Sequence, residues 1–307
     1  MLLDDVLKEF LFHIQIQNYS KKTQKGYKNN NLAFQKFIME EFDITEIEDV
    51  RPQHIKSYFQ YLQQKGRKPT YINGILRNIR SFFKYCVNEG YIPENQNPCL
   101  KVNWMKQPKT VIQTFTDEEI QKMVNSFKTD KWINARNKLI LMTFVDTGIR
   151  ASELIDIKVD DVTETTIKIH GKGNKERFVY ISPVLKKYMI KYERMTEFYF
   201  KDKMRTNNYF LSYRGLPLTV EALERVVKIA GKRAKVREEI RCSPHTIRHF
   251  YAIKQLKLGQ DVYTVSRLLG HEDLNITRTY LSSLADSEIV EMGRMASPLM
   301  NLGRKSK

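Results

Sequence analysis

The sequence predicts a mainly α-helical protein with a small antiparallel β-sheet, divided into a helical N-terminal domain and a larger second domain. Its 307 residues are enough for about two domains, each with a core of its own. Apolar residues recur every three or four positions along most of the chain, in segments that begin at capping residues and end at glycines. One stretch, residues 166–181, alternates apolar and polar residues instead, and that pattern is typical of a β-hairpin.

The first hundred residues are predicted to form four helices joined by short connections. Ser20 and Thr70 are good caps for the second and fourth helices, and Pro52 suits the start of the third. The expected helices cover residues 4–17, 20–40, 52–64 and 71–88. Aromatic residues at helical spacing are expected in the core rather than against nucleobases: Tyr58, Phe59, Phe82, Phe83 and Tyr85.

Domain boundaries follow from composition. The segment 93–113 holds three prolines and scattered lysines between two runs of helical pattern, as an interdomain linker does. We therefore predict a helical N-terminal domain, a linker, a second domain and a tail helix at residues 1–100, 101–113, 114–307 and about 284–303. The second domain should contain helices from Thr116, over 133–147 and after Arg150, the hairpin, a helix over 186–205, a short strand at 209–211, a helix over 219–231 and three short helices between Ser243 and Leu281.

Net charge favours a nucleic-acid partner. Lys and Arg total 52 against 35 acidic residues, a balance of +17, and a strongly basic chain is the electrostatic signature of a nucleic-acid binder. Residues 51–109 carry eleven Lys and Arg against two acids, whereas residues 1–50 carry more acids than bases. The alternative, a basic enzyme with a solvated face, explains the total charge but not this local imbalance.

The expected location is the cytoplasm of a bacterial-type cell, in association with the nucleoid and not with a membrane. The chain has three cysteines without metal-ligand spacing, which suggests a reducing compartment. No apolar run approaches the roughly 20 residues that span a bilayer, and the N-terminus lacks a basic signal-peptide start.

Candidate catalytic residues lie in short motifs of the second domain. His245 and Arg248 stand three apart on one helix face, an arrangement that suits a phosphate. Arg150 follows Gly148 at a helix start, and further candidates follow in chain order: Glu153, Lys172 in the hairpin turn, His271 and Tyr280. Each of these residues alone also has a structural explanation. Arg150 or Glu153 could form a surface ion pair, Lys172 could be a solvated turn residue, His271 a cap donor and Tyr280 a core aromatic. His249 is expected to be structural.

Taken together and in this order, the motifs resemble those of the tyrosine recombinase (phage integrase) family, in a compact Xer-like or mobile-element type. The family pattern is Arg, then Lys on a β-turn, then His-x-x-Arg, then His or Trp, then Tyr. Here it is met by TGIRASELIDI, HGKGNK, PHTIRHF, LLGH and TRTYL, with His271 at the variable position. The match covers the second domain motif by motif, and the first by size and helix count only.

The resemblance implies two domains that clamp DNA and a site-specific recombinase that works through a 3′-phosphotyrosyl intermediate. Tyr280 is the expected nucleophile, and Arg150 and Arg248 are expected to bind the non-bridging phosphate oxygens. His245 is the candidate general base, Lys172 the general acid, and His271 a hydrogen-bond donor to phosphate. Glu153 is expected to order the site without touching substrate.

Neither ATP nor a metal ion is expected, since the phosphotyrosyl link conserves the bond energy. HGKGNK does not fit a phosphate-binding P-loop, and Thr246 stands where a zinc motif requires Glu. The expected partners are double-stranded DNA with inverted-repeat core sites and three further copies of the chain, assembled on two DNA segments through the tail, from Ile289 to Met300. The alternative for the tail is that it packs on its own chain or frays. The family also allows an accessory directionality factor.

Several alternatives remain open from the sequence. Integration or excision of a mobile element and Xer-like resolution share the same motifs. A type IB topoisomerase-like enzyme, a non-catalytic DNA-binding regulator and a structural DNA-coating protein also fit a basic two-domain chain.

Overall fold

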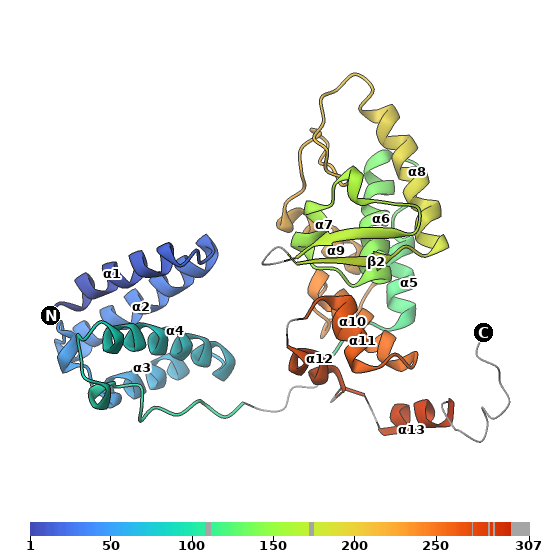
Figure 1. Ribbon diagram of the computed structural model, residues 1–307. Helices are drawn as coiled ribbons and strands as arrows, with labels where there is room; N and C mark the ends of the chain where they lie inside the picture. The colour runs from blue at the N-terminus through green and yellow to red at the C-terminus, as the bar shows by residue number, and fades with distance from the viewer. Residues whose placement is uncertain (108–111, 172–174, 272, 282, 285, 296–307) are drawn as a thin grey trace. The chain divides into compact units, whose positions relative to one another are not determined.

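The computed structural model describes residues 1–107, 112–171, 175–271, 273–281, 283–284 and 286–295, and the chain forms two compact units (Figure 1). The units comprise Met1–Lys109 and Thr110–Lys307. The described chain is mostly helical with one two-stranded antiparallel sheet, so the predicted fold class is confirmed. No helix within the described ranges is long and apolar enough to cross a membrane.

The first unit consists of four helices that pack around an apolar core. They are α1 (Leu3–Ile16), α2 (Lys21–Phe42), α3 (Pro52–Gln64) and α4 (Pro69–Asn88), with short 3-10 turns at Ile47–Asp49 and Glu94–Gln96. Ser20 caps α2 as predicted, because its hydroxyl accepts a hydrogen bond from the Thr23 amide at 3.2 Å. The prediction that Thr70 caps α4 was wrong: the helix begins at Pro69, which suits a first turn, and Lys68 is the N-cap.

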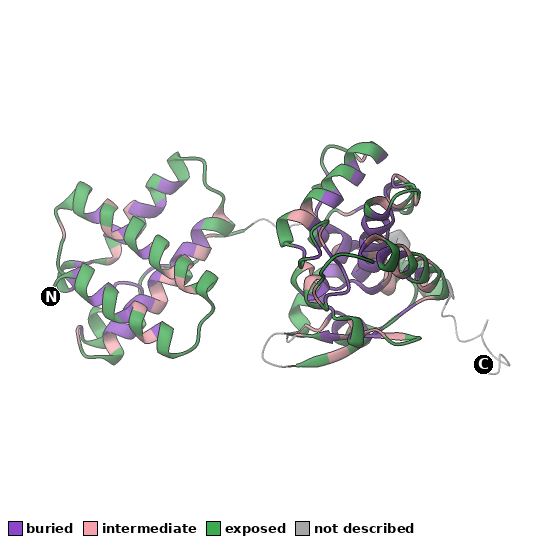
Figure 2. Ribbon diagram, turned by 90° about the horizontal axis from the view of Figure 1, so that it is seen from above, coloured by how far each residue is buried: buried purple, intermediate pink, exposed green. Residues whose placement is uncertain are grey.

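Aromatic side chains fill this core, as the helical spacing predicted. Tyr58, Phe59, Phe82, Phe83 and Tyr85 are all buried, and Figure 2 shows buried residues along the inward faces of the four helices. Ring pairs such as Phe10 and Phe82, with centroids 5.6 Å apart, meet edge to face.

The chain beyond α4 remains attached to this first core. Asn73 exchanges two hydrogen bonds with the backbone of Met105, at 2.9 and 3.0 Å, and the guanidinium of Arg80 lies over the Trp104 ring, 4.4 Å from its centroid. Residues 101–105, which fall within the predicted linker, therefore pack against α4.

The second unit is built around α6 (Trp132–Thr147), which packs against α5, α8, α9 and α10. The elements around it are α5 (Asp117–Asn125), α7 (Ala151–Asp156), a 3-10 turn at Val159–Asp161, β1 (Thr166–His170), β2 (Glu176–Tyr180), α8 (Pro183–Tyr199), α9 (Val220–Ala234), α10 (Pro244–Lys257), α11 (Val262–Leu269), α12 (Leu274–Leu281) and α13 (Asp286–Met295). Most of α6 is buried, including charged residues on its sides, so it is the central core helix that its apolar sequence predicted.

Gly148 ends α6 in a conformation that only glycine adopts easily. Its φ is +62°, and a Cβ at this position would collide with the ring of Tyr251. The turn leads directly into Arg150, the N-cap of α7, so the end of the core helix places the first candidate catalytic residue.

The hairpin forms as predicted, and its strands pair with Thr166 opposite Tyr180, but its turn residue Lys172 lies outside the described residues. Two predicted elements of this unit differ from those observed. Residues 209–211 form no strand and make only an isolated bridge, between Leu211 and Pro217, because no neighbouring segment continues the pairing. Helix α8 begins earlier than predicted, since Ser182 caps it, and ends at Tyr199. Of the tail helix, Asp286–Met295 is observed as α13, and residues 296–303 lie outside the described part.

Candidate active site

Helix α10 carries the His-x-x-Arg motif and begins where the sequence predicted. The Ser243 hydroxyl accepts a hydrogen bond from the Thr246 amide at 3.3 Å, and Pro244 occupies the first helical position. Arg248 is 4% exposed, and its guanidinium donates to the backbone carbonyls of Gly148 at 2.8 Å and Leu269 at 2.7 Å. Burial, and then the charge of Arg150, lower the pKa of Arg248 to about 10, so it stays positively charged at neutral pH.

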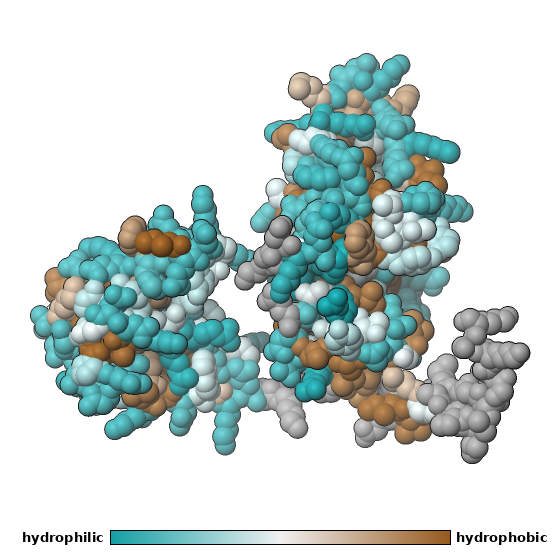
Figure 3. Space-filling model, viewed as in Figure 1, coloured by the Kyte–Doolittle hydropathy of each residue, from teal (hydrophilic) through white to brown (hydrophobic). Residues whose placement is uncertain are grey.

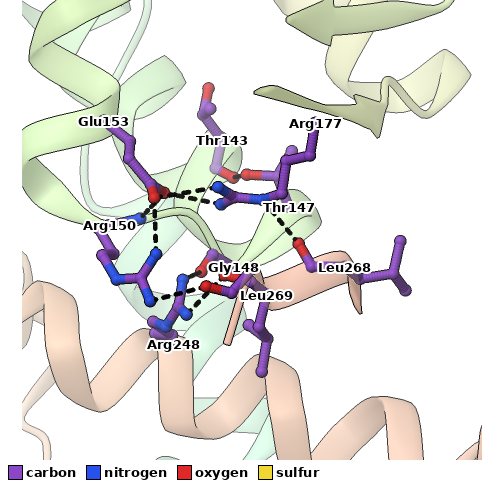
Figure 4. Close-up of polar contacts among 10 residues, drawn as sticks. Thr143, Thr147, Gly148, Arg150, Glu153, Arg177, Arg248, Leu268 and Leu269 are labelled. Atoms are coloured by element: carbon purple, nitrogen blue, oxygen red, sulfur yellow. Dashed lines mark hydrogen bonds and ion pairs between the residues drawn. The ribbon is translucent and has the colours of Figure 1, made fainter. Parts of the chain in front are cut away.

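Arg150 and Glu153 form the second part of the site, at the start of α7 (Figure 4). The Glu153 carboxylate accepts from the Arg150 amide at 2.8 Å and from its guanidinium at 2.7 Å, so the helix cap and the ion pair use one side chain. Arg150 also donates to the carbonyl of Gly270 at 3.0 Å. This contact brings α7 and the end of α11 together.

Arg177 on β2 is a member of the site that the sequence analysis missed. Its guanidinium donates to Glu153 at 2.7 and 3.0 Å and to the carbonyl of Leu268 at 3.0 Å. The alternation of the strand could have indicated it, because Arg177 lies on the same inward face as buried Val179. A charged residue on a buried face requires a partner.

Glu153 stays ionised because it has two arginine partners. Its side chain is 5% exposed, and burial alone would raise the pKa of this carboxyl. Hydrogen bonds and charge from Arg177, followed by those from Arg150, outweigh burial and lower the pKa to about 2. The carboxylate thus fixes the positions of two guanidiniums.

The C-terminus of α11 brings three arginines together. The carbonyls of Leu268, Leu269 and Gly270 accept hydrogen bonds from Arg177, Arg248 and Arg150, respectively (Figure 4). The last carbonyls of a helix have no partner within the helix and form the negative end of its dipole, so cations are favoured there. Each guanidinium has five N–H groups, which is more than these bonds occupy.

Two candidate histidines lie beside these arginines. His271 follows Gly270, and its Nδ1 lies 2.8 Å from the Thr277 hydroxyl. Burial, and then Arg248, lower the pKa of His271 to about 4. Partial burial and Arg248 also lower the pKa of His245, so both rings are neutral at pH 7.

A cleft of about 1070 Å³ opens beside this group, and Arg150, Arg177, Arg267 and His271 contribute to its lining. Gly171 and Lys175, which flank the undescribed turn with Lys172, line the same cleft, and a hydrogen bond of 2.7 Å from the Gly171 amide to the Lys175 carbonyl closes the hairpin stem. Glu153, Asp156 and Glu176 line the cleft as well, so its guanidiniums rather than its net charge suit a phosphate anion.

Tyr280 on α12 is buried, with 2% of its surface exposed. Burial raises the pKa of its phenol, and the nearby charges of Arg248 and Arg150 oppose that effect. Its hydroxyl lies 3.1 Å from Nδ1 of His249, the histidine that the sequence analysis treated as structural. Among the described residues, the structure records no hydrogen bond between Tyr280 and the expected base, His245.

Comparison with known proteins identifies both units. Residues 113–286 match the model of the phage integrase family, and residues 6–92 match that of the phage integrase N-terminal SAM-like domain. The chain is 28% identical to tyrosine recombinase XerD of Staphylococcus haemolyticus, over 96% of this chain and 99% of the relative. It is 32% identical to tyrosine recombinase XerC of Thermodesulfovibrio yellowstonii, over 89% of this chain and 90% of the relative. The fold is similar to that of XerH site-specific recombinase bound to its difH DNA after cleavage, with a TM-score of 0.72, 20% identity and coverage of 92% of this chain and 82% of that one.

Fold, site and relatives together define the class of protein: it is an enzyme that cuts and rejoins DNA through a tyrosine. Within that class, the chain belongs to the phage integrase family and is a tyrosine recombinase of the Xer-like type. The topoisomerase-like and non-catalytic alternatives are not favoured.

Proposed function

We propose that this recombinase cleaves double-stranded DNA at inverted-repeat core sites and that Tyr280 forms the 3′-phosphotyrosyl link. One observation carries the proposal: Arg150 and Arg248 donate to the adjacent carbonyls of Gly270 and Leu269, a single turn before the segment that carries Tyr280. Two guanidiniums held on neighbouring carbonyls suit the two non-bridging oxygens of one phosphate.

The reaction proceeds by in-line displacement at phosphorus. Arg150, Arg248 and His271 stabilise the charge that develops on the phosphoryl oxygens, while the Tyr280 oxygen attacks. Lys172 protonates the departing 5′ oxygen, and Glu153 acts through Arg150 and Arg177 without touching the substrate. The phosphotyrosyl bond replaces the phosphodiester bond, so the strand can be resealed without ATP, and the two arginines neutralise charge without a metal ion.

The working form is proposed to be a tetramer on two DNA segments, with the tail of one copy docked on the next. Exposed apolar side chains support this assembly. Ile289 and Val290 of α13 are 50% and 71% exposed, and Figure 3 shows hydrophobic surface over α12 and α13. The rest of the predicted tail contact, up to Met300, lies outside the described residues. An accessory directionality factor is a further expected partner, and the nucleoid is the expected location.

The names of the two relatives support a recombinase of the Xer-like type. Both relatives are named as Xer recombinases, and the alignments extend over nearly the full length of each chain.

A covalent-trapping experiment tests the proposal. Nicked DNA from the gene's flanking sequence, and random genomic fragments, are incubated with wild type and with Tyr280→Phe, and the products are resolved on a denaturing gel. We expect an adduct with wild type and none with the variant, since phenylalanine lacks the attacking oxygen.

Arg150→Ala serves as the companion variant. It should form no adduct yet bind DNA almost as tightly as wild type, because binding depends on many phosphate contacts. An adduct with Tyr280→Phe would assign the nucleophile to another residue. Tight DNA binding by wild type without an adduct on any DNA would favour a non-catalytic regulator.

A further inference from the structure

His249 is placed to act on the attacking atom. It follows His245 by one helical turn on α10, and its Nδ1 lies 3.1 Å from the Tyr280 hydroxyl. Among the residues that the structure describes, no other hydrogen bond is recorded for the Tyr280 hydroxyl. The rings of His249 and Tyr280 meet edge to face with centroids 5.4 Å apart, so the contact involves packing as well as one bond.

The surroundings of His249 keep its ring neutral. Burial, followed by His245 and Arg248, lowers its pKa to about 4. The groups that face it are those two residues of α10, with a ring distance of 4.2 Å to His245, and Tyr280 of α12. When the neutral ring carries its proton on Nε2, Nδ1 accepts the phenol hydrogen bond.

We propose that His249 is the general base for Tyr280, which deepens the proposed function and rests on it. As the Tyr280 oxygen forms its bond to phosphorus, the phenol proton passes to Nδ1 of His249 and the bond from phosphorus to the 5′ oxygen breaks. The 5′ oxygen takes a proton from the general acid. In resealing, the 5′ oxygen attacks phosphorus as its hydroxyl proton returns to the residue that had acted as the general acid, while the Tyr280 oxygen leaves and takes its proton back from His249.

Substrate itself makes this base effective. Without DNA, burial and the positive charge of Arg248 disfavour an imidazolium at position 249. A phosphate bound to Arg248 and Arg150 brings a negative charge that offsets the charge of Arg248, and the pKa of His249 rises toward its usual range. Proton transfer is therefore favoured only when a phosphodiester occupies the site.

This assignment gives His245 a different role from the one its sequence motif suggested. His245 is exposed on α10, beside Arg248 and one turn from the Tyr280 contact. From there the His245 ring can donate a hydrogen bond to a phosphate oxygen held by Arg248. In this role His245 takes no proton from the Tyr280 phenol.

His249→Asn and His249→Ala separate proton transfer from positioning. The amide oxygen of Asn takes the place of Nδ1 and accepts a hydrogen bond, but it does not take up a proton near neutral pH. Single-turnover cleavage of nicked DNA is measured with both variants, after circular dichroism and DNA binding have verified their folding. We expect both variants to be slower than wild type by about 100-fold or more, and Asn to be no better than Ala.

A substrate with sulfur in place of the 5′ bridging oxygen identifies which proton transfer each variant lacks. The thiolate is a good leaving group and needs no acid, so this substrate should restore Lys172→Ala but not His249→Asn. Near wild-type cleavage by His249→Asn would overturn the inference, as would its rescue by sulfur. If wild type forms no Tyr280 adduct on any DNA, the proposed function falls as well, so the two failures are distinguishable.

Discussion

Glu153 is a single carboxylate shared by two arginines, and its charge has a measurable effect on stability. In the folded chain its pKa is about 2, against 4.5 for an ordinary glutamate, so the ionised form is favoured by folding. This contribution is complete above the unfolded value and is lost as the pH falls through the folded value. Glu153 is therefore a stabilising group at neutral pH and a weak point in acid.

Glu153→Gln should be less stable than wild type by about 3 kcal/mol at pH 7, because Arg150 and Arg177 lose their counter-charge in a largely buried site. Between pH 5 and pH 3 the difference should shrink by about 2 kcal/mol, since the unfolded chain then takes up a proton at Glu153 while the folded carboxylate, with a pKa of about 2, stays ionised. Urea unfolding at a series of pH values measures both quantities.

Glu164→Gln is the matched control, because Glu164 pairs with Lys186 at 3.0 Å but is 84% exposed. That substitution should change stability by less than about 1 kcal/mol at any pH. A pH-independent loss of stability in Glu153→Gln would mean that shape, rather than charge, accounts for its effect.

At the scale of elements, the C-terminus of α11 joins three segments through one short turn. Gly270 ends the helix with φ of +66°, and a Cβ there would lie 2.9 Å from Nη1 of Arg177. Any side chain at this position would therefore displace the guanidinium that orders Glu153.

Gly270→Ala and Gly259→Ala form a matched pair. Gly259 also has a positive φ, +88°, but a Cβ there would meet nothing within 4 Å. Both substitutions should cost about 1 kcal/mol of stability for the left-handed backbone, and only Gly270→Ala should slow adduct formation. Equal rates for the two variants in the trapping assay would contradict the importance of this turn.

Local signals predicted most elements, and long-range packing accounts for the rest. Ser20 was recognised as a cap and helices were expected from Thr116 and Ser243, and all three side chains accept the cap hydrogen bond from the backbone. Arg177 was missed because its partners are 24 and 91 positions away. The role of His249 was missed because its sequence neighbours place it on a helix, whereas only the tertiary fold brings α12 against that helix.

At the scale of the whole molecule, two units with separate cores carry a net charge of +17. In the first unit, Arg77 and Lys84 are exposed on α4 and lie two turns apart, within the segment of eleven basic residues. Exposed cations at that spacing lie on one helix face and suit contacts to a DNA backbone.

Replacing Arg77 and Lys84 together with alanine should weaken binding to all DNA sequences alike. The slope of log affinity against log salt should become shallower by about 0.9 for each phosphate that the variant no longer neutralises. Fluorescence anisotropy at several salt concentrations measures this slope. The control is the double variant Lys8→Ala and Lys36→Ala. Because these two lysines pair with acidic neighbours on α1 and α2, the control should leave the salt slope unchanged. Weaker binding confined to one DNA sequence would indicate base recognition instead.

The three arginines of the site are held by backbone carbonyls, which every type of amino acid supplies equally. A scan that replaces side chains one by one would therefore score the partly exposed Leu268 as tolerant, although its carbonyl holds Arg177. Replacing the amide that follows Leu268 with an ester, which weakens the carbonyl as an acceptor without altering any side chain, would reveal the contact. This contact is thus invisible to side-chain substitution at the residue that supplies it.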